Sequence, residues 1–401
     1  MLTREANNIE RGAMRGQGGA GASCVLDARS GDGPCFTVFS SAEASSWRAL
    51  VEEAAVSDAG HLPDLWLHAE GRGEGSAFLF VCREGSDFVA LPLLLRPIRA
   101  VPGLEECGGS DAVSVGDYAG PLASGPDVPV ALIQHFQREL TAELRRRGVI
   151  FAFSKLNPIL GQEQFLDGLG STEYAQTTVS IDLTLSPDEQ FGRFRPRLRS
   201  YLRNALRDNL EPCYLDYDEH LAECLEIYGE TMDRVGAADV FRYPDSFYAS
   251  LRSGLGDRFH LFGVRHAGRL VATYLGTEWN GILQGIISCV RTEALPLSPA
   301  RVMYDSMRRW STDRGCRVFH LGGGTSPAPD NPLFVFKAGF SDCRHEFRTW
   351  KWTIDPVAYG EACGLRAAWN ARHGLVPARA DFFPAYRCPT RTLPDESFSP
   401  R

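Results

Sequence analysis

The chain has 401 residues, of which 44% are apolar and 23% charged, and its net charge is −8. This length predicts two or three domains, and the composition excludes a collagen, a coiled coil and a wholly disordered chain. The acidic balance disfavours binding of nucleic acid over the whole surface, although a local basic patch stays open. No segment approaches the ~18 uncharged apolar residues that a membrane span needs, so none is expected.

The cysteines and histidines form no recognisable metal or disulfide pattern. The eleven cysteines are odd in number and scattered, and no two form a C-x-x-C pair; zinc and thioredoxin-like sites are therefore not expected. The nine histidines show no H-E-x-x-H spacing. The first 23 residues lack the apolar stretch of a secretory signal. We expect a cytoplasmic protein with reduced thiols and no bound metal.

The first half of the chain reads as alternating helices and strands. Residues 1–34 are rich in Gly, Ala, Ser and Arg and are expected to form a flexible tail. The strand at 88–96 is apolar at almost every position, which is typical of a strand buried on both faces. Apolar periodicity predicts, in chain order, a helix at 45–55, a hairpin at 77–83 and 88–96, a helix at 129–147 and strands at 149–153 and 177–183.

The second half repeats this order. The pattern predicts helices at 186–209, 220–235 and 244–255, a meander of strands at 259–265, 270–279 and 282–290, a helix at 299–314, a strand at 318–321, a short helix at 331–338 and a strand at 345–353. A helix, a glycine and a buried strand thus follow a hairpin twice, at 143–153 and 310–321. This predicts two tandem copies of one α/β unit, although two unrelated α/β halves would look similar.

The most specific motif lies near the C-terminus. Three consecutive glycines, Gly322, Gly323 and Gly324, end a predicted strand, and Phe336-Lys337-x-Gly339-Phe340 follows. This pair resembles the C-terminal signature of the FemABX family and of related acyltransferases with the GNAT fold. Two weaker matches support it. They are the segment Arg199-x3-Arg203-x-Ala205, similar to the family's R-x3-R-x-A, and the turn Asp117-Tyr118-Ala119-Gly120-Pro121, similar to its aromatic–Gly-Pro turn.

The resemblance implies an α/β fold of two GNAT-like domains, each with a mixed sheet flanked by helices. We expect these domains at 35–185 and 186–375, with a C-terminal extension at 376–401. Known members of the family transfer an amino acid from aminoacyl-tRNA to an amine, and relatives form amide bonds in natural products. The resemblance therefore implies an aminoacyltransferase that uses charged tRNA and an amine of a natural product or a cell-wall precursor, with no DNA partner.

Two departures from the family's pattern qualify this expectation. Staphylococcal members carry a long helical arm, and the segment 208–257 has no room for one. Ordinary GNAT enzymes hold the CoA pyrophosphate with a glycine-rich loop, whereas residues 294–300 contain Pro296 and Pro299 at that position. Proline lacks the backbone N–H that would bind phosphate. CoA is therefore the less expected donor, and no other cofactor is expected.

The candidate catalytic residues are Lys337 and Asp117. Lys337 lies in an apolar frame, where a lysine either reaches solvent or faces a site. In a site, its ammonium would stabilise the oxyanion of an acyl transfer. Asp117 and Tyr118 could orient an amine or accept its proton, although an aspartate in a Gly-flanked turn is more often only part of the turn.

The candidate substrate-binding residues are Tyr118, Phe336, the glycines 322–324, and Arg199 with Arg203. The two arginines are four residues apart and share one face of a predicted helix. Such a stripe suits phosphate, although charge runs are usually solvated surface. The glycines permit close approach of a ligand to the backbone, or else a wide turn without one.

Two other activities fit the same sequence. One is an acyl-CoA-dependent N-acyltransferase on the same fold. The other is a non-catalytic pair of GNAT-like domains that binds a small amine, because a fold does not fix a function.

Overall fold

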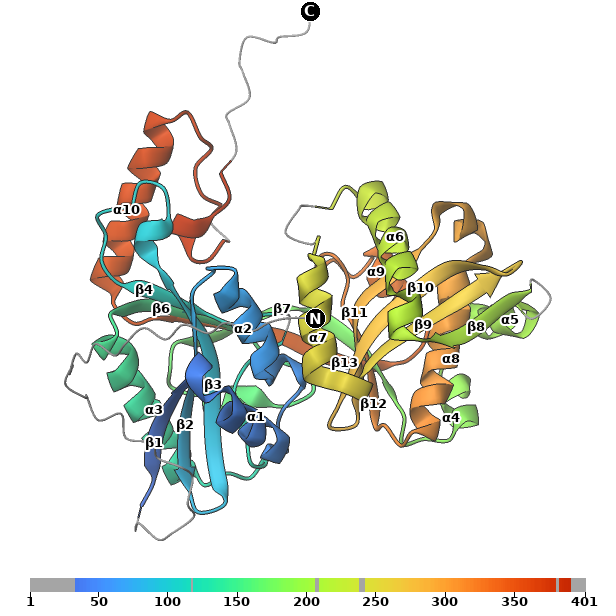
Figure 1. Ribbon diagram of the computed structural model, residues 1–401, viewed down its shortest axis with the longest axis horizontal. Helices are drawn as coiled ribbons and strands as arrows, with labels where there is room; N and C mark the ends of the chain where they lie inside the picture. Colours follow the sequence, from blue (N-terminus) through green and yellow to red (C-terminus); the bar gives the residue numbers. More distant parts are fainter. Residues whose placement is uncertain (1–32, 117, 206–208, 238–241, 380–381, 391–401) are drawn as a thin grey trace, which may run out of the picture. The chain divides into compact units, whose positions relative to one another are not determined.

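The structure is a computed structural model that describes residues 33–116, 118–205, 209–237, 242–379 and 382–390 (Figure 1). From Pro34 onward the chain forms one compact unit. The predicted tail at 1–34 lies almost entirely outside the described residues, as do Asp117 and the last part of the C-terminal extension.

The first half contains a hairpin, a long helix and a buried strand, as the sequence predicts. Its strands are β1 (Cys35–Ser40), β2 (Ser76–Glu84), β3 (Asp87–Pro97), β4 (Ser110–Val113), β5 (Leu122–Ala123), β6 (Val149–Lys155) and β7 (Ser171–Asp182). Its helices are α1 (Ala44–Glu53), α2 (Pro63–Gly71) and α3 (Val130–Arg146).

The second half has the same order of elements. Its strands are β8 (Leu210–Leu215), β9 (Phe259–His266), β10 (Arg269–Trp279), β11 (Ile282–Val290), β12 (Val318–Gly322) and β13 (Cys343–Thr353). Its helices are α4 (Pro187–Gly192), α5 (Pro196–Ala205), α6 (Tyr217–Val235), α7 (Asp245–Leu255), α8 (Pro299–Asp313) and α9 (Pro332–Lys337), followed by α10 (Pro356–Arg372).

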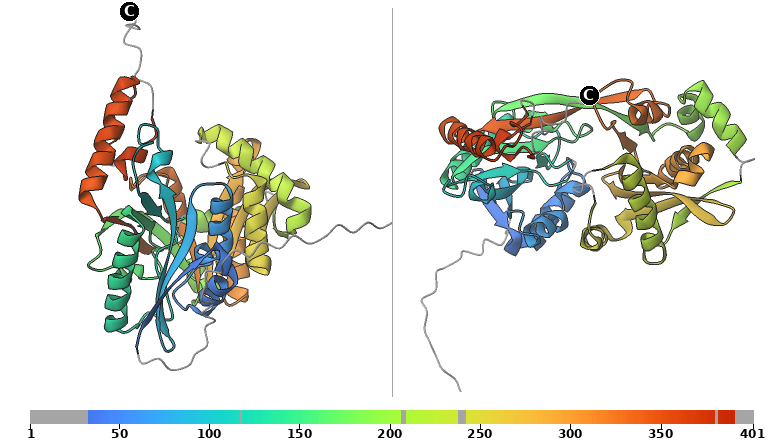
Figure 2. Two further views of the ribbon diagram at one scale, coloured as in Figure 1. Left: turned by 60° about the vertical axis from the view of Figure 1, so that its left-hand side comes forward. Right: turned by 90° about the horizontal axis from the view of Figure 1, so that it is seen from above.

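One hydrogen-bonded sheet runs through both halves, in the order β1-β2-β3-β4-β6-β13-β7-β12-β11-β10-β9-β8. The internal repeat is visible in this order, because β4 pairs with β6 in parallel and β11 pairs with β12 in parallel at equivalent places. The last strand of each half lies in the other half. Strand β13 pairs with β6, β7 pairs with β12, and the two exchanged strands pair with each other (Figure 2). The two tandem α/β units predicted from sequence are confirmed, with this exchange added.

The two halves also share a hydrophobic core. Trp47 and Trp66 of the first half belong to the same buried cluster as Tyr248 and Leu251 of α7. The Trp279 indole donates to the Ser57 hydroxyl across the same interface, at 3.0 Å. A shared apolar core of this kind makes the halves one folding unit rather than two separable domains. The domain boundary predicted near residue 185 stays a prediction. Strand β7, just before it, pairs with β12 of the second half, and β13 of the second half pairs with β6 of the first.

Strand β3 is buried along nearly its whole length, as its apolar composition predicts. One of its faces packs with α1 and α2, and the other packs with α3. A strand covered on both faces needs apolar residues at consecutive positions.

The single helix predicted at 186–209 is wrong, because the structure has two helices there, α4 and α5. Pro196 separates them. A proline disfavours helical geometry at the preceding residue and has no N–H for a helical bond, so α4 ends at Gly192, residues 193–195 are not helical, and Pro196 begins α5. Helices α2 and α10 and strands β1, β4, β5 and β8 are elements that the sequence pattern did not reveal.

The first residues of the C-terminal extension are tied to the first half through Asp111. This buried carboxylate accepts hydrogen bonds from Arg96 at 2.7 Å and from the Tyr386 hydroxyl at 3.1 Å, and it also pairs with Arg387. A buried charge with three such partners is well satisfied. The described part of the extension is therefore an integral part of the fold.

Candidate functional site

The glycine turn at the end of β12 has Lys337 beside it. The Lys337 ammonium donates to the Gly323 carbonyl oxygen at 2.7 Å. Lys337 ends α9, whose first turn is capped by the Asn331 side chain. The aromatic residues of α9 pack on the core below it, while Lys337 reaches back over the turn. This hydrogen bond fixes the position of the ammonium at the carboxyl end of a buried strand.

One of the three glycines has a clear conformational reason. Gly322 has φ of +75°, a backbone conformation that favours glycine. At Gly323 and Gly324 a Cβ atom would lie 2.6 Å from the side-chain oxygens of Gln176 and Asn331, which would have to move. Gly322 therefore suits the turn even without a ligand, and a role of the three glycines in substrate binding stays a prediction.

Tyr118 comes from the first half and lies against the second. Its ring centroid is 5.4 Å from that of His320 on β12 and 5.3 Å from that of Phe347 on β13. The structure thus brings the predicted aromatic–Gly-Pro turn together with the strand that leads into the predicted glycine turn. Asp117, the other residue predicted in this turn, lies outside the described residues.

A buried polar cluster holds the Tyr118 turn in place. The His61 ring contacts the Gly120 carbonyl oxygen at 3.0 Å, and the Gln162 amide donates to the Pro121 carbonyl oxygen at 2.7 Å. Asp58 pairs with His61 at 3.1 Å. Burial by itself lowers the pKa of His61, but the Asp58 carboxylate more than offsets this, so that the net shift is upward.

His320 is a residue of this region that the sequence analysis did not single out. It is 1% exposed, and its Nδ1 lies 3.1 Å from the Gln284 side-chain oxygen. Its other nitrogen, Nε2, is buried without a hydrogen-bond partner among the described residues. Burial lowers the pKa of His320 to about 3, and the positive charges of Lys337 and His345 act in the same direction. In the sequence, His320 could have been noticed because it lies in a predicted buried strand just before three glycines.

The surrounding sheet face is unusually polar. Ser180 and Thr178 of β7 are buried, and the Ser180 hydroxyl contacts His345 Nε2 at 2.7 Å. The Gln176 side-chain oxygen is buried with no hydrogen-bond partner among the described residues. Buried polar atoms are rarely left unpaired. Two such atoms, on Gln176 and His320, therefore mark this face as a place where a ligand could supply the missing partners.

Positive charge gathers beside the same turn. Burial lowers the pKa of Arg344 and the nearby charge of Arg195 adds to the effect, while burial and Arg344 together lower the pKa of His345. The backbone N–H of Arg195 donates to the Gly339 carbonyl oxygen at 2.9 Å, which brings the start of α5 against the end of the α9 segment. An anion would be stabilised in these surroundings.

The two predicted arginines lie on α5, as the spacing predicts. The Arg199 guanidinium donates to the Gly192 carbonyl oxygen at 2.9 Å, and the Arg203 guanidinium lies 5.7 Å from the centroid of the Phe191 ring. Neither forms an ion pair with an acidic side chain within the described part of the chain. Arg203 is exposed and Arg199 is half-buried. Both therefore keep charge that is not neutralised by a described carboxylate, and their role in binding stays a prediction.

The start of α8 is the place where an ordinary GNAT enzyme would hold pyrophosphate. Pro299 occupies the first position of the helix, and Ser298 before it has φ of +48°. The Tyr201 hydroxyl, from α5, donates to the carbonyl oxygens of Leu297 and, at 3.2 Å, of Ser298. The Tyr201 ring in turn lies under the Arg301 guanidinium, 4.7 Å from the ring centroid. Carbonyl oxygens and a tyrosine ring thus occupy the approach to this helix end.

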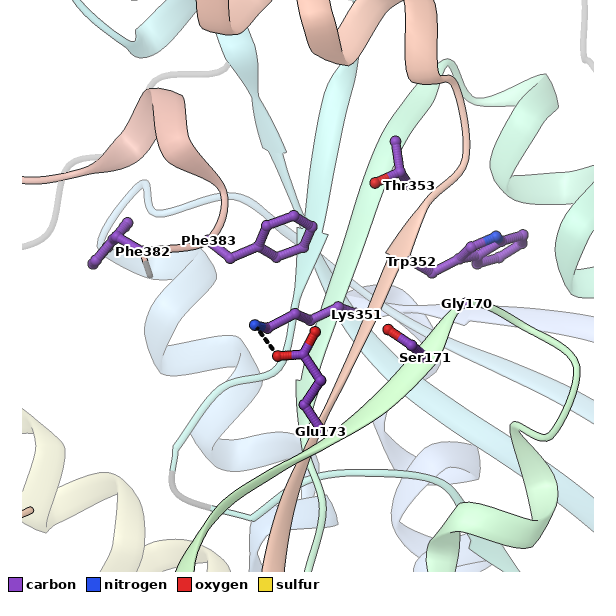
Figure 3. Close-up of a pocket in the computed structure, with 8 residues that line it drawn as sticks. All are labelled: Gly170, Ser171, Glu173, Lys351, Trp352, Thr353, Phe382 and Phe383. Atoms are coloured by element: carbon purple, nitrogen blue, oxygen red, sulfur yellow. Dashed lines mark hydrogen bonds and ion pairs between the residues drawn. The ribbon is translucent and has the colours of Figure 1, made fainter. Parts of the chain in front are cut away.

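A separate pocket of about 610 Å³ opens at the other end of β7 and β13 (Figure 3). Lys351 and Glu173 form an ion pair of 2.6 Å in its wall. Its lining residues are Gly170, Ser171, Glu173, Lys351, Trp352, Thr353, Phe382 and Phe383. None of the predicted site residues lines this pocket.

Phe336 packs into the core beneath α9, 5.3 Å from the Tyr304 ring and 5.4 Å from the Phe340 ring. It is only partly buried, and its predicted contact with a substrate stays a prediction. In the part of the chain that the structure describes, no group of three or more His, Cys, Asp or Glu side chains could hold a metal ion. None of the described helices is both long and apolar enough to cross a membrane.

Comparison with known proteins places this geometry in a recognisable class of folds. Residues 192–329 match the family model of the acetyltransferase (GNAT) domain. No curated protein matches the chain. The crystal structure of FemX is similar over 79% of this chain and 98% of its own, with 13% identity and a TM-score of 0.62.

A second solved structure has the same arrangement. It is the C-terminal domain (DUF2156) of a putative lysylphosphatidylglycerol synthetase from Agrobacterium fabrum, with a TM-score of 0.52 and 14% identity, over 80% of this chain and 95% of that one. Identities this low carry information about the fold alone. The protein is a tandem GNAT-fold chain of the structural type seen in FemX, and the resemblance found in the sequence is confirmed at that level.

Proposed function

We propose that the protein is an aminoacyltransferase that forms an amide bond between an aminoacyl group, delivered as an ester on tRNA, and an amine. The observation that carries this proposal is the ammonium of Lys337, fixed by the Gly323 carbonyl beside a polar, positively charged sheet face. The acceptor is a small-molecule amine, of a natural product or of a cell-wall precursor.

The proposed reaction needs no covalent intermediate with the enzyme, because the ester is already activated. The amine nitrogen attacks the ester carbonyl carbon, the carbonyl oxygen becomes an oxyanion, and the ribose oxygen then departs. Lys337 supplies a positive charge for the oxyanion or for the departing oxygen, and the charge of Arg344 reinforces it. Holding two reactants together in this geometry contributes most of the remaining rate acceleration.

The choice of tRNA over CoA is supported by the start of α8. Pro299 brings no N–H donor to the helix end, and Tyr201 covers the carbonyl oxygens just before it. A pyrophosphate needs backbone donors at a helix N-terminus. The arginines of α5 provide a basic surface next to α9 that suits the phosphates of RNA instead.

Sensitivity to ribonuclease tests the proposal. The protein is incubated with a pool of charged tRNA and candidate amines, and amide products are measured by mass spectrometry with and without ribonuclease treatment. We expect product only with intact tRNA. Product from acyl-CoA that survives ribonuclease would favour the N-acyltransferase, and binding of amines without any product would favour the non-catalytic alternative.

A further inference from the structure

We propose that His320 is a catalytic residue, whose Nε2 accepts the hydrogen bond of the attacking amine and takes up its proton. This inference rests on the proposed amide-forming function and deepens it. It begins from a buried polar atom: Nε2 has no hydrogen-bond partner among the described residues, on an imidazole that is otherwise completely enclosed.

The tautomer of His320 follows from its neighbour. The Gln284 side-chain oxygen lies 3.1 Å from Nδ1 and can only accept, so Nδ1 carries the proton. In a neutral imidazole the other nitrogen then has a lone pair and no hydrogen. Nε2 is therefore an acceptor that points away from β11.

The surroundings of the ring keep it neutral. Burial lowers its pKa most, Lys337 of α9 and His345 of β13 are the charged or titratable groups that act in the same direction, and the Tyr118 ring from the first half lies 5.4 Å from its ring. The positive charge of Lys337 also disfavours an ammonium form of the acceptor amine. The amine would thus be neutral, which is the form that can attack, and the neutral Nε2 of His320 would accept its N–H hydrogen bond.

The position of His320 joins the two parts of the proposed site. It lies two residues before the glycine turn that holds Lys337, and the ring of Tyr118 from the first half lies 5.4 Å from it. A carbonyl held near the Lys337 ammonium would thus have His320 on the same stretch of strand. In the proposed reaction the Lys337 ammonium serves the carbonyl oxygen, and Nε2 of His320 serves the amine that attacks the same carbonyl group.

His320 takes up one proton during the reaction and releases it again. The new C–N bond forms while the amine hydrogen moves to Nε2, and the oxyanion near Lys337 offsets the charge of the imidazolium that results. When the ester C–O bond breaks, the same proton passes to the departing ribose oxygen. The imidazole returns to its neutral form, and no proton is gained or lost overall.

The first test compares His320→Asn with His320→Gln. The Asn amide can still donate to Gln284 but leaves nothing at the position of Nε2, whereas the longer Gln can bring its oxygen close to that position. We expect His320→Asn to lower kcat by about 10²-fold, the lower range for general base catalysis, with tRNA binding unchanged. His320→Gln should recover part of that loss.

A matched control separates this role from packing. His68 of α2 also has a buried Nε2 without a hydrogen-bond partner among the described residues, and its Nδ1 contacts the Ser250 hydroxyl at 3.3 Å. It lies away from β12, so His68→Asn should change stability without changing kcat. Equal losses of kcat in the two Asn variants would overturn the inference, as would a wild-type kcat in His320→Asn.

A second variant keeps the imidazole, in case His320→Asn does not fold. Gln284→Glu places a carboxylate at Nδ1–H, which raises the pKa of His320. We expect activity to be lost on acidification at a higher pH than in the wild type. An unmoved pH profile would contradict a role in proton transfer. Failure of the proposed function itself would look different, because the wild-type protein would then form no amide from charged tRNA.

Discussion

Lysine is the residue whose placement says most about this protein. The chain has three lysines among many arginines, and they are Lys155, Lys337 and Lys351. Lys337 and Lys351 differ in surroundings, because one is held by a backbone carbonyl beside a glycine turn and the other by the carboxylate of Glu173. The Lys351 ammonium thus lies in an ion pair, whereas the Lys337 ammonium is positioned by a carbonyl oxygen of the glycine turn.

This difference defines a prediction for Lys337. Replacement by methionine keeps the apolar stem and removes the charge, so Lys337→Met should fold normally and lose about 10²–10³-fold in kcat, with little change in KM. Arginine should restore activity only partly, because its planar fork cannot occupy the same point. Steady-state kinetics on charged tRNA measure both effects.

Lys351→Met is the matched control for that experiment. It removes the same ammonium from the opposite end of β13, and kcat should stay near the wild-type value. A wild-type kcat in Lys337→Met would assign Lys337 to the solvated surface. A rise in KM alone would make it a residue that binds substrate and transition state equally.

At the scale of elements, α5 contacts the segment after α9 and carries Arg199 and Arg203, the two arginines proposed to bind RNA. Its apolar side packs into the core, and its N-terminal backbone bonds to Gly339. Tyr201 holds the loop before α8, while Arg199 and Arg203 lie toward α4. One short helix thus connects three features that the sequence presented separately.

We predict that Arg199 and Arg203 bind phosphates of the donor. The double replacement Arg199→Ala and Arg203→Ala should raise KM for charged tRNA and make it less sensitive to salt, with the logarithmic salt slope reduced by about one for each phosphate that is no longer bound. Replacement of Arg138 and Arg145 by alanine, on the exposed side of α3, is a control that removes the same charge. If KM and the salt slope do not change, Arg199 and Arg203 do not bind the donor and are ordinary surface residues.

The start of α8 predicts weak binding of CoA. Pro299 at the first helical position removes one of the N–H donors that a pyrophosphate would use, and Tyr201 bonds to the carbonyl oxygens just before it. Calorimetric titration with acetyl-CoA should give no heat of binding in the micromolar range. Micromolar affinity would instead make the acyl-CoA-dependent N-acyltransferase the preferred function.

At the scale of the whole molecule, buried histidines tie stability to pH. Histidine in an unfolded chain titrates near 6.5, whereas the pKa of buried His320 is lowered to about 3. Between these values the unfolded state binds more protons, so stability rises with pH across this window and is lost as pH falls. His61, whose pKa is raised, contributes stability below pH 6.5 and loses it as pH rises through its folded pKa.

Urea unfolding between pH 7 and pH 4.5 measures this effect, above the range where carboxylates dominate. We expect the free energy of unfolding to fall by a few kcal/mol over the window, at about 1.4 kcal/mol per pH unit for His320 alone. His320→Asn should flatten the slope even if it is less stable at pH 7. The same slope in both proteins would mean that other groups cause the acid sensitivity.

The sequence by itself determined most elements and the class of fold. Apolar periodicity depends on local spacing, so the meanders, the helices α3 and α8, and the strands β6 and β12 could be read from it. The glycine turn with its lysine was also readable, because the motif is local in sequence, and Gly322 adopts a positive φ that favours glycine. Pro196 marked the break between α4 and α5 in the sequence, but the prediction of one helix at 186–209 did not take it into account.

Only the tertiary structure decided which strands and side chains meet. The exchange of β7 and β13 depends on pairing between residues more than 160 positions apart, such as Ser180 and Cys343, and no local pattern encodes it. The same exchange frames the sheet face where Tyr118 of one half lies over His320 of the other. The sequence around a histidine in a buried strand does not show whether its ring nitrogens have hydrogen-bond partners. The state of its Nε2 follows from the neighbours that folding supplies, and those neighbours come from three different parts of the chain.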